Sequence, residues 1–106
     1  MMEISLERIR DLCEKRKIKW SIHAVVRYQE RGITRKEIIE CIRYGDIIEE
    51  YPTDYPNPSC LMFHCMDSNK PLHVVVGYNE NTLFVITAYR PDFDIWKGGF
   101  RERKER

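Results

Sequence analysis

Residues 21–34 read Ser21-Ile-His-Ala-Val-Val-Arg-Tyr-Gln-Glu-Arg-Gly-Ile-Thr34 and predict a helix with a defined start and end. The Ser21 side chain can accept a hydrogen bond from the first unpaired N–H groups of a helix. Gly32 can adopt the left-handed conformation that commonly ends one. Between them His23, Arg27 and Arg31 follow at intervals of four residues. Each interval advances about 40° around a helix, so the three project from one side. This stripe suits a phosphate-binding site, and it equally suits a solvated helix face.

Two further helices are predicted on either side of this one. Apolar residues recur at helical spacing in residues 5–16, where Ser5 is a candidate cap, and residues 17–20 form an extended link. Thr34 and Glu37 have the spacing of a capping box, which opens a helix that Gly45 ends. We expect the helix from residue 21 to bury Ile22, Val25 and Val26, and the next one Ile38, Ile39 and Ile42.

The second half of the chain predicts strands at residues 46–51, 60–66, 72–78 and 82–89, the last three joined by short turns. Residues 92–106 predict a short C-terminal helix. Helices followed by strands favour an α+β fold, with N-terminal helices on one face of a four-stranded, mainly antiparallel sheet. The other face of the sheet would then be open for binding.

The length of 106 residues fits a single domain, and the 42% hydrophobic and 33% charged residues are typical of a globular protein. No apolar run approaches the ~20 residues of a membrane helix. The N-terminus lacks the pattern of a secretory signal, so we expect a cytoplasmic protein without a membrane partner. No pattern assigns an oligomeric state.

Four cysteines are present, and their spacing argues against a metal site. Cys13 and Cys41 fall on apolar helix faces and are predicted to be buried. Cys60 and Cys65 should point to opposite faces of one strand. His64 adjoins Cys65, but the usual zinc-ligand spacings are missing. We therefore expect no metal and no other cofactor.

Strand alternation sorts the remaining polar candidates. His73 should point away from the face formed by Leu72 and Val74. On the last strand, strict alternation puts Thr87 and Tyr89 on the face of Leu83 and Val85, and Arg90 on the other face. The strand register decides which set lies near His73.

The candidate catalytic set combines histidine, arginine, threonine and tyrosine without paired carboxylates: His23, Arg27, Arg31, His73, Thr87 and Tyr89. Histidine or tyrosine can move protons, and arginine can stabilise a pentavalent phosphate. The set therefore favours acid–base cleavage of RNA at its 2′-hydroxyl. Each residue alone also has a simpler explanation as a half-buried or solvated side chain.

Four segments together resemble a prokaryotic domain family of unknown function that is grouped with the RelE, ParE and BrnT toxins. They are residues 21–34, 47–51, 71–75 and 86–91. The resemblance covers residues 20–91 as a toxin-like core, between an N-terminal helix with its link (1–19) and a basic tail (92–106). It implies the same α+β fold.

The resemblance also implies the toxin of a toxin–antitoxin pair, acting as a small metal-independent ribonuclease on RNA or at the ribosome. A small antitoxin protein would be its partner. We expect four basic residues near the C-terminus to bind nucleic acid: Arg90, Arg101, Arg103 and Lys104.

Two other functions are compatible with the same residues. In one, the arginine stripe and the basic tail form the surface of a non-enzymatic module that binds protein or RNA. In the other, the polar residues hold the helices to the sheet and take part in no chemistry.

Overall fold

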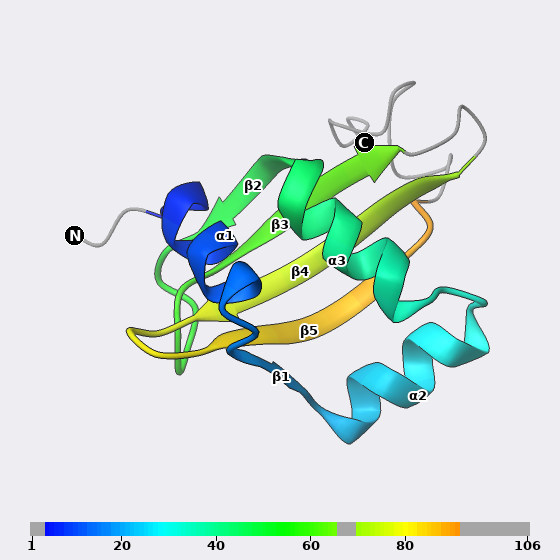
Figure 1. The fold of residues 1–106 in the computed structure, drawn as a ribbon, viewed down its shortest axis with the longest axis horizontal. Coiled ribbons are helices and arrows are strands. Elements are labelled where there is room, and N and C mark those ends of the chain that lie inside the picture. Colours follow the sequence, from blue (N-terminus) through cyan, green and yellow to red (C-terminus); the bar gives the residue numbers. More distant parts are fainter. Residues whose placement is uncertain (1–3, 66–69, 92–106) are drawn as a thin grey trace.

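The structure is a computed structural model that describes residues 4–65 and 70–91. One sheet has five strands in the order β1-β5-β4-β3-β2, with the helices of the described segments packed along it (Figure 1). The elements in chain order are α1 (Leu6–Glu14), β1 (Ile18–Trp20), α2 (Ile22–Glu30), α3 (Arg35–Tyr44), β2 (Asp46–Tyr51), β3 (Ser59–Cys65), β4 (Pro71–Tyr78) and β5 (Leu83–Tyr89). The predicted α+β class is confirmed.

The sheet has one strand more than the sequence predicts. Strands β2 to β5 pair antiparallel in sequence order, as expected. The segment taken for an extended link is β1, which pairs parallel with β5 so that Lys19 lies opposite Phe84. The prediction of four strands was wrong because this three-residue strand has a partner far along the chain, and no local turn marks that pairing. The predicted C-terminal helix lies outside the described residues.

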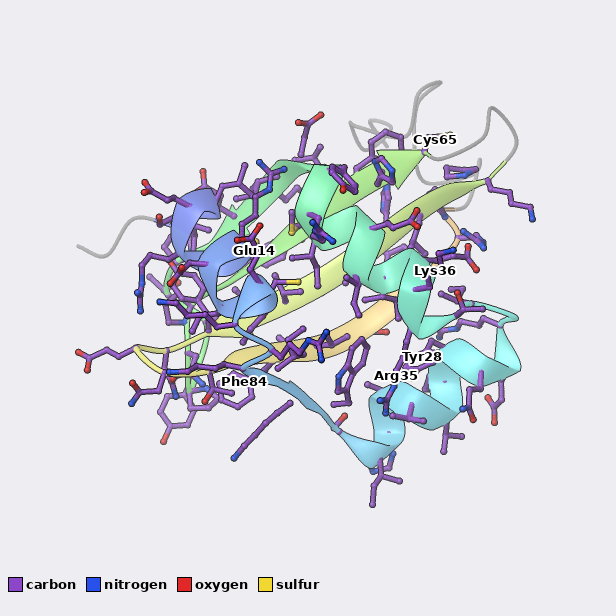
Figure 2. All side chains as sticks on the ribbon, in the orientation of Figure 1. Glu14, Tyr28, Arg35, Lys36, Cys65 and Phe84 are labelled. Carbon is purple, nitrogen blue, oxygen red and sulfur yellow. The ribbon has the colours of Figure 1, made fainter. Side chains whose placement is uncertain are left out.

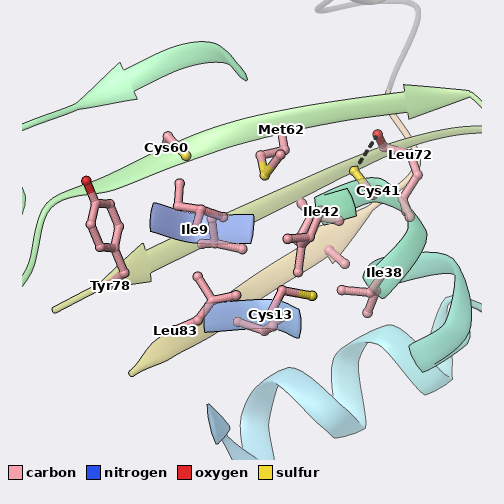
Figure 3. Close-up of a cluster of buried hydrophobic side chains, with 14 of the residues drawn as sticks. Ile9, Cys13, Ile38, Cys41, Ile42, Cys60, Met62, Leu72, Tyr78 and Leu83 are labelled. Carbon is pink, nitrogen blue, oxygen red and sulfur yellow. Dashed lines mark hydrogen bonds between the residues drawn. The ribbon is translucent and has the colours of Figure 1, made fainter. Parts of the chain in front are cut away.

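The main hydrophobic core lies between the sheet and helices α1 and α3, which cover one face (Figures 1 and 3). Ile38 and Ile42 of α3 are fully buried there, as predicted, and Ile39 is half-buried against the same cluster. Cys13 and Cys41 are buried as predicted. We refer to this side of the sheet as the helix face and to the other, on which no helix of residues 4–65 and 70–91 packs, as the helix-free face.

Helix α3 begins and ends as the sequence predicts. Thr34 Oγ1 accepts from the Glu37 backbone N–H at 3.1 Å, and Glu37 Oε1 accepts from the Thr34 backbone N–H at 3.3 Å. At the other end, Gly45 has an extended backbone. A Cβ atom there would lie 2.4 Å from the Cys41 carbonyl oxygen and 2.5 Å from that of Phe63. Steric exclusion therefore requires glycine at this helix end.

Helix α2 also has its predicted ends. Ser21 Oγ accepts from the Ala24 backbone N–H at 3.0 Å, and Gly32 has a positive φ of 70°. Ser5 caps α1 in the same way, accepting from the Arg8 backbone N–H at 3.2 Å. These local signals are therefore sufficient to place the helix boundaries.

The buried side of α2 differs from the prediction. Ala24 and Tyr28 are each 2% exposed, whereas Ile22 is 82% and Val26 46% exposed. Val25 is partly buried against the core. The prediction was wrong for Ile22 and Val26 because it overlooked Tyr28. An aromatic ring buries more apolar area than an aliphatic side chain and so sets the rotation of the helix.

Tyr28 is fixed by neighbours from two other elements. Its ring meets that of Trp20 edge-on, with centroids 5.9 Å apart. Its hydroxyl accepts from Arg35 Nε at 3.0 Å, and the Arg35 guanidinium carbon lies 4.8 Å from the centroid of the Trp20 ring (Figure 2). These contacts tie α2 to β1 and to the first turn of α3.

Strand β5 contains a bulge that changes which side chains share a face. Val76 pairs with Val85 and Val75 pairs with Thr87, so Ile86 is the extra residue. Beyond the bulge, Ala88 joins the buried helix face. The predicted common face of Leu83, Val85, Thr87 and Tyr89 was therefore wrong, since strict alternation fails across a bulge.

The helix-free face is not open throughout. Its residues Leu61, Phe63 and His73 are 1%, 8% and 0% exposed. The expectation of an open face is therefore wrong around these residues. Accessible side chains on this face include Ile86, which is 46% exposed, near the end of β5 that adjoins β1. No helix within the described segments is long and apolar enough to cross a membrane.

Candidate functional site

The register of β4 and β5 brings His73 and Tyr89 together on the helix-free face. The two residues are directly paired, and His73 Nδ1 lies 3.3 Å from the Tyr89 hydroxyl oxygen. Their ring centroids are 5.3 Å apart, and the Phe63 ring packs edge-on against His73 at 5.7 Å. His73 is fully buried, whereas Tyr89 is partly exposed. The tyrosine is therefore the member of this pair that can meet a ligand.

Arg31 approaches the same strand from α2. Arg31 is the C-cap of that helix, and the next residue, Gly32, has the positive φ that ends it. Its Nη1 donates to the Ala88 carbonyl oxygen at 2.8 Å and to Thr87 Oγ1 at 3.4 Å. Strand β1 pairs with residues 83–85 of β5. The Arg31 guanidinium therefore contacts the part of β5 that follows this pairing.

These contacts connect four of the six predicted catalytic residues. Thr87 and Tyr89 lie two positions apart on the same face of β5, so they join the Arg31 contact to the His73 contact. We call this group the β5 cluster: Arg31, Thr87, Tyr89 and His73. In this cluster the Arg31 guanidinium contacts one end of the strand segment, at Thr87, and the buried His73 imidazole contacts the other, at Tyr89.

His23 and Arg27 do not join the β5 cluster. Both are exposed on α2. Neither side chain has a hydrogen bond or an ion pair within residues 4–65 and 70–91. Since His73 is buried on the helix-free face, the two histidines do not line one open pocket.

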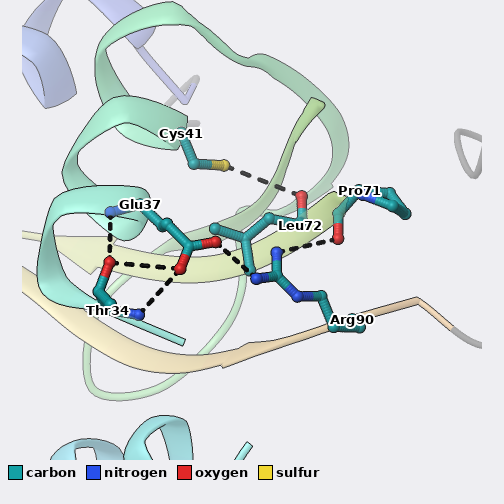
Figure 4. A network of polar contacts seen from close by, with 6 residues as sticks. All are labelled: Thr34, Glu37, Cys41, Pro71, Leu72 and Arg90. Carbon is teal, nitrogen blue, oxygen red and sulfur yellow. Dashed lines mark hydrogen bonds and ion pairs between the residues drawn. The ribbon is translucent and has the colours of Figure 1, made fainter. Parts of the chain in front are cut away.

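Arg90 forms an ion pair in this structure. Its Nη2 lies 2.5 Å from Glu37 Oε2, and its Nη1 donates to the Pro71 carbonyl oxygen at 3.3 Å (Figure 4). Partial burial tends to raise the pKa of Glu37, but the hydrogen bonds and charge of Arg90, with Thr34, lower it overall. Arg90 therefore joins α3 to strand β4.

The remaining predicted nucleic-acid contacts, Arg101, Arg103 and Lys104, lie outside the described residues. In the described parts of the chain, no three His, Cys, Asp or Glu side chains gather as a metal site would require.

Two neighbouring hollows on the surface were not predicted. One, of about 340 Å³, lies between the β2–β3 loop and β5, and the other, of about 380 Å³, lies beside β1. They share Phe84 and Ile86 as a common wall. The available signal was Lys19, a charged residue between Ile18 and Trp20, which alternation places on the opposite side from those two.

A family model describes most of this chain. The model for the domain of unknown function DUF4258 matches residues 20–90. The match begins at the last residue of β1, contains α2, α3 and the four antiparallel strands β2 to β5, and includes the whole β5 cluster. Comparison with curated proteins and with solved structures gives no match. Since the matched residues make up more than half of the sequence, the chain belongs to the DUF4258 family.

Proposed function

We propose that this protein is a metal-independent ribonuclease whose reaction takes place at the β5 cluster. The observation that carries the proposal is the contact between Tyr89 and His73, with Arg31 bonded to Thr87 on the same strand. Proton-transferring groups and a guanidinium are what RNA cleavage at a 2′-hydroxyl needs. The set has no paired carboxylates, so glycoside hydrolysis is a poor fit.

The chemistry divides between the exposed and the buried members of the cluster. Tyr89 takes the proton of the RNA 2′-hydroxyl while its own hydroxyl proton passes to His73 Nδ1. The 2′-oxygen then bonds to phosphorus, the bond from phosphorus to the 5′-oxygen breaks, and that oxygen takes a proton from water. The products are a 2′,3′-cyclic phosphate and a 5′-hydroxyl. His73 acts through Tyr89 and does not touch the RNA.

Arg31 would stabilise the charge that develops on the phosphate. Its Nη1 donates to Ala88 and Thr87, which holds the guanidinium against β5. Its other nitrogens make no hydrogen bond within the described segments, so they can donate to a phosphate. The exposed His23 and Arg27 stay predicted contacts to the RNA.

The resemblance to the RelE, ParE and BrnT toxins supports the biological side of the proposal. We propose that the protein is the toxin of a toxin–antitoxin pair in the cytoplasm. RNA or the ribosome would be its target, and a small protein would neutralise it. The helices on one face of an antiparallel meander are compatible with that grouping.

Tyr89→Phe is the direct test, because it removes one hydroxyl and keeps the ring. We expect the purified variant to cut an end-labelled oligoribonucleotide in EDTA at least about 100-fold more slowly than wild type. Tyr44→Phe, at a 63% exposed position on α3, is the matched control and should cut at the wild-type rate. The wild-type product should carry a 2′,3′-cyclic phosphate.

Expression of the same variants tests the toxin role. We expect growth arrest with wild type and Tyr44→Phe, and relief with Tyr89→Phe. Equal cleavage by Tyr89→Phe and wild type would refute the role of the β5 cluster. Wild-type protein that leaves RNA uncut would refute the ribonuclease.

The exposed side of α2 favours a second function, a non-enzymatic binding module. Ile22 and Val26 are exposed next to His23 and Arg27, so an apolar and basic helix surface is available to a partner. In this case neither wild type nor any variant would cleave RNA. Affinity for RNA would fall steeply with salt, whereas a protein partner bound through the apolar residues would resist salt.

A further inference from the structure

We propose that the hollow between Tyr55 and Phe84 binds one base of a single-stranded RNA. The inference rests on the proposed function, because it names the substrate class of that same activity. It concerns the hollow of about 340 Å³, which lies at the lower end of the ~300–1,000 Å³ range of small-ligand pockets.

The walls of the hollow have the character of a stacking site. Tyr55 and Phe84 both line it, and Tyr55 is 94% exposed, so its ring can close over a ligand. Figure 2 shows Phe84 at the end of β5 that adjoins β1. Aromatic rings bind successive bases of single strands because every base offers a flat face.

A glycine keeps the hollow open at its floor. Gly77 lines it from β4, and a Cβ atom there would lie 3.3 Å from the Pro58 carbonyl oxygen and 3.4 Å from Ile86 Cδ1. A larger side chain would therefore compete with Ile86 for the same space. This arrangement leaves room for a planar group next to Phe84.

Asp54 gives the hollow a carboxylate, which accepts hydrogen bonds. It is the charged side chain among the described residues that line the hollow, and its Oδ2 accepts from Ser59 Oγ at 2.6 Å. A carboxylate has acceptor sites beyond one hydrogen bond. It pairs with the amino group of cytosine, which uracil lacks. We therefore expect cytosine to bind in preference to uracil.

Lys19 supplies a cation where the RNA backbone would continue. It lies opposite Phe84 in the parallel β1–β5 pair and lines the neighbouring hollow, which shares Phe84 and Ile86. A phosphate there would meet the ammonium group while the base stacks on the other side of Phe84. From Ile86 to Tyr89, β5 covers about 10 Å on one surface, which a strand of a few nucleotides spans.

The test measures binding of a fluorescent 2′-O-methyl oligocytidine by anisotropy in EDTA. The methyl group blocks the nucleophile, so binding is measured without cleavage. We expect Tyr55→Ala and Phe84→Ala each to raise Kd about ten-fold. Lys19→Gln should lower the slope of log Kd against log salt by about one. Tyr44→Ala, an exposed tyrosine on α3 that lines neither hollow, should bind as wild type.

Base preference provides a second readout. Wild type should bind oligocytidine more tightly than oligouridine, and Asp54→Asn should reduce that ratio. Phe84→Leu keeps the bulk of the side chain, so a folded Phe84→Leu that binds weakly separates loss of stacking from loss of structure. Thermal melting of each variant checks the fold.

The two proposals fail separately. If Tyr55→Ala and Phe84→Leu bind RNA as wild type does, the hollow is not the site, whatever the cleavage assay gives. If they bind weakly but Tyr89→Phe still cuts, the hollow stands and the β5 cluster is not catalytic. Wild-type protein that does not bind the oligonucleotide overturns the inference outright.

Discussion

At the scale of single residues, the arginines that the sequence singled out have different surroundings. Arg31 projects from the end of α2 and bonds to β5, and Arg90 bonds to Glu37 and Pro71. Arg27, one turn before Arg31, is exposed on the helix surface. Spacing along a helix predicts which residues share a side, but it cannot show that the third of them bonds to a distant strand.

The Glu37–Arg90 pair makes a prediction about pH. At pH 7 we expect Glu37→Gln and Arg90→Gln each to lower the free energy of unfolding by about 1–2 kcal/mol, because each breaks a charged hydrogen bond. The pKa of Glu37 is lowered from its ordinary value of 4.5. The contribution is therefore complete above about pH 4.5 and is lost as pH falls through the lowered value.

Urea unfolding of wild type and Glu37→Gln at a series of pH values provides the measurement. The difference in unfolding free energy between the two proteins should be constant near neutral pH and shrink below pH 4.5. A difference that does not change between pH 7 and pH 3 would show that the ion pair adds no stability.

At the scale of elements, local signals predicted the helices and the meander well. Caps such as Ser21 and Thr34 act within three residues, so sequence alone locates them. The pairing of β1, the bulge at Ile86 and the rotation of α2 depend on contacts between distant segments. Strand faces past the bulge, and with them the neighbours of His73, therefore could not be read from alternation.

The rotation of α2 can be tested by replacing isoleucine with alanine at an exposed position of α2 and, for comparison, at a buried position of α3. Ile22→Ala should change the free energy of unfolding by less than about 0.5 kcal/mol, because Ile22 is 82% exposed. Ile38→Ala should lower it by about 2–5 kcal/mol, because Ile38 is fully buried on α3. Thermal and urea unfolding measure both. Similar losses at the two positions would contradict the observed packing of α2.

At the scale of the whole molecule, the candidate site could be predicted only in part. The sequence identified all members of the β5 cluster, and their residue types led to the proposed chemistry. It did not show that His73 is buried or that Tyr89 faces it, since both depend on register. The hollow at Phe84 was not predicted, because it combines a loop, two sheet strands and a glycine from separate parts of the chain.

The rate at which the cysteine thiols react measures whether the hydrophobic core is intact. Burial raises the pKa of both Cys41 and Cys60 to about 12, with smaller contributions from neighbouring groups, and burial also raises the pKa of Cys13. Cys65 is exposed. Since the thiolate is the reactive form, a disulfide reagent at pH 8 should modify Cys65 rapidly and the other three only as the protein unfolds.

Counting modified thiols by mass spectrometry, with and without urea, checks this expectation. Cys65→Ser is the control and should abolish the fast phase. Rapid modification of Cys41 in the native protein would mean that α3 separates readily from the sheet.

The extra residue in β5 makes the odd and even positions of this strand exchange roles at Ile86. Before it, odd-numbered residues face the helices, and after it even-numbered ones do. Deleting Ile86 would restore a single alternation and leave Tyr89 opposite His73, because Val85 and Thr87 on either side of it already pair with consecutive residues of β4. In a family alignment, a relative without the extra residue should therefore have its gap at Ile86, and a gap placed at Ala88 or later would exchange inward and outward residues. The pairing of the residues after the bulge, as much as their composition, is thus what holds a tyrosine over the buried histidine, and relatives can keep it with or without the extra residue.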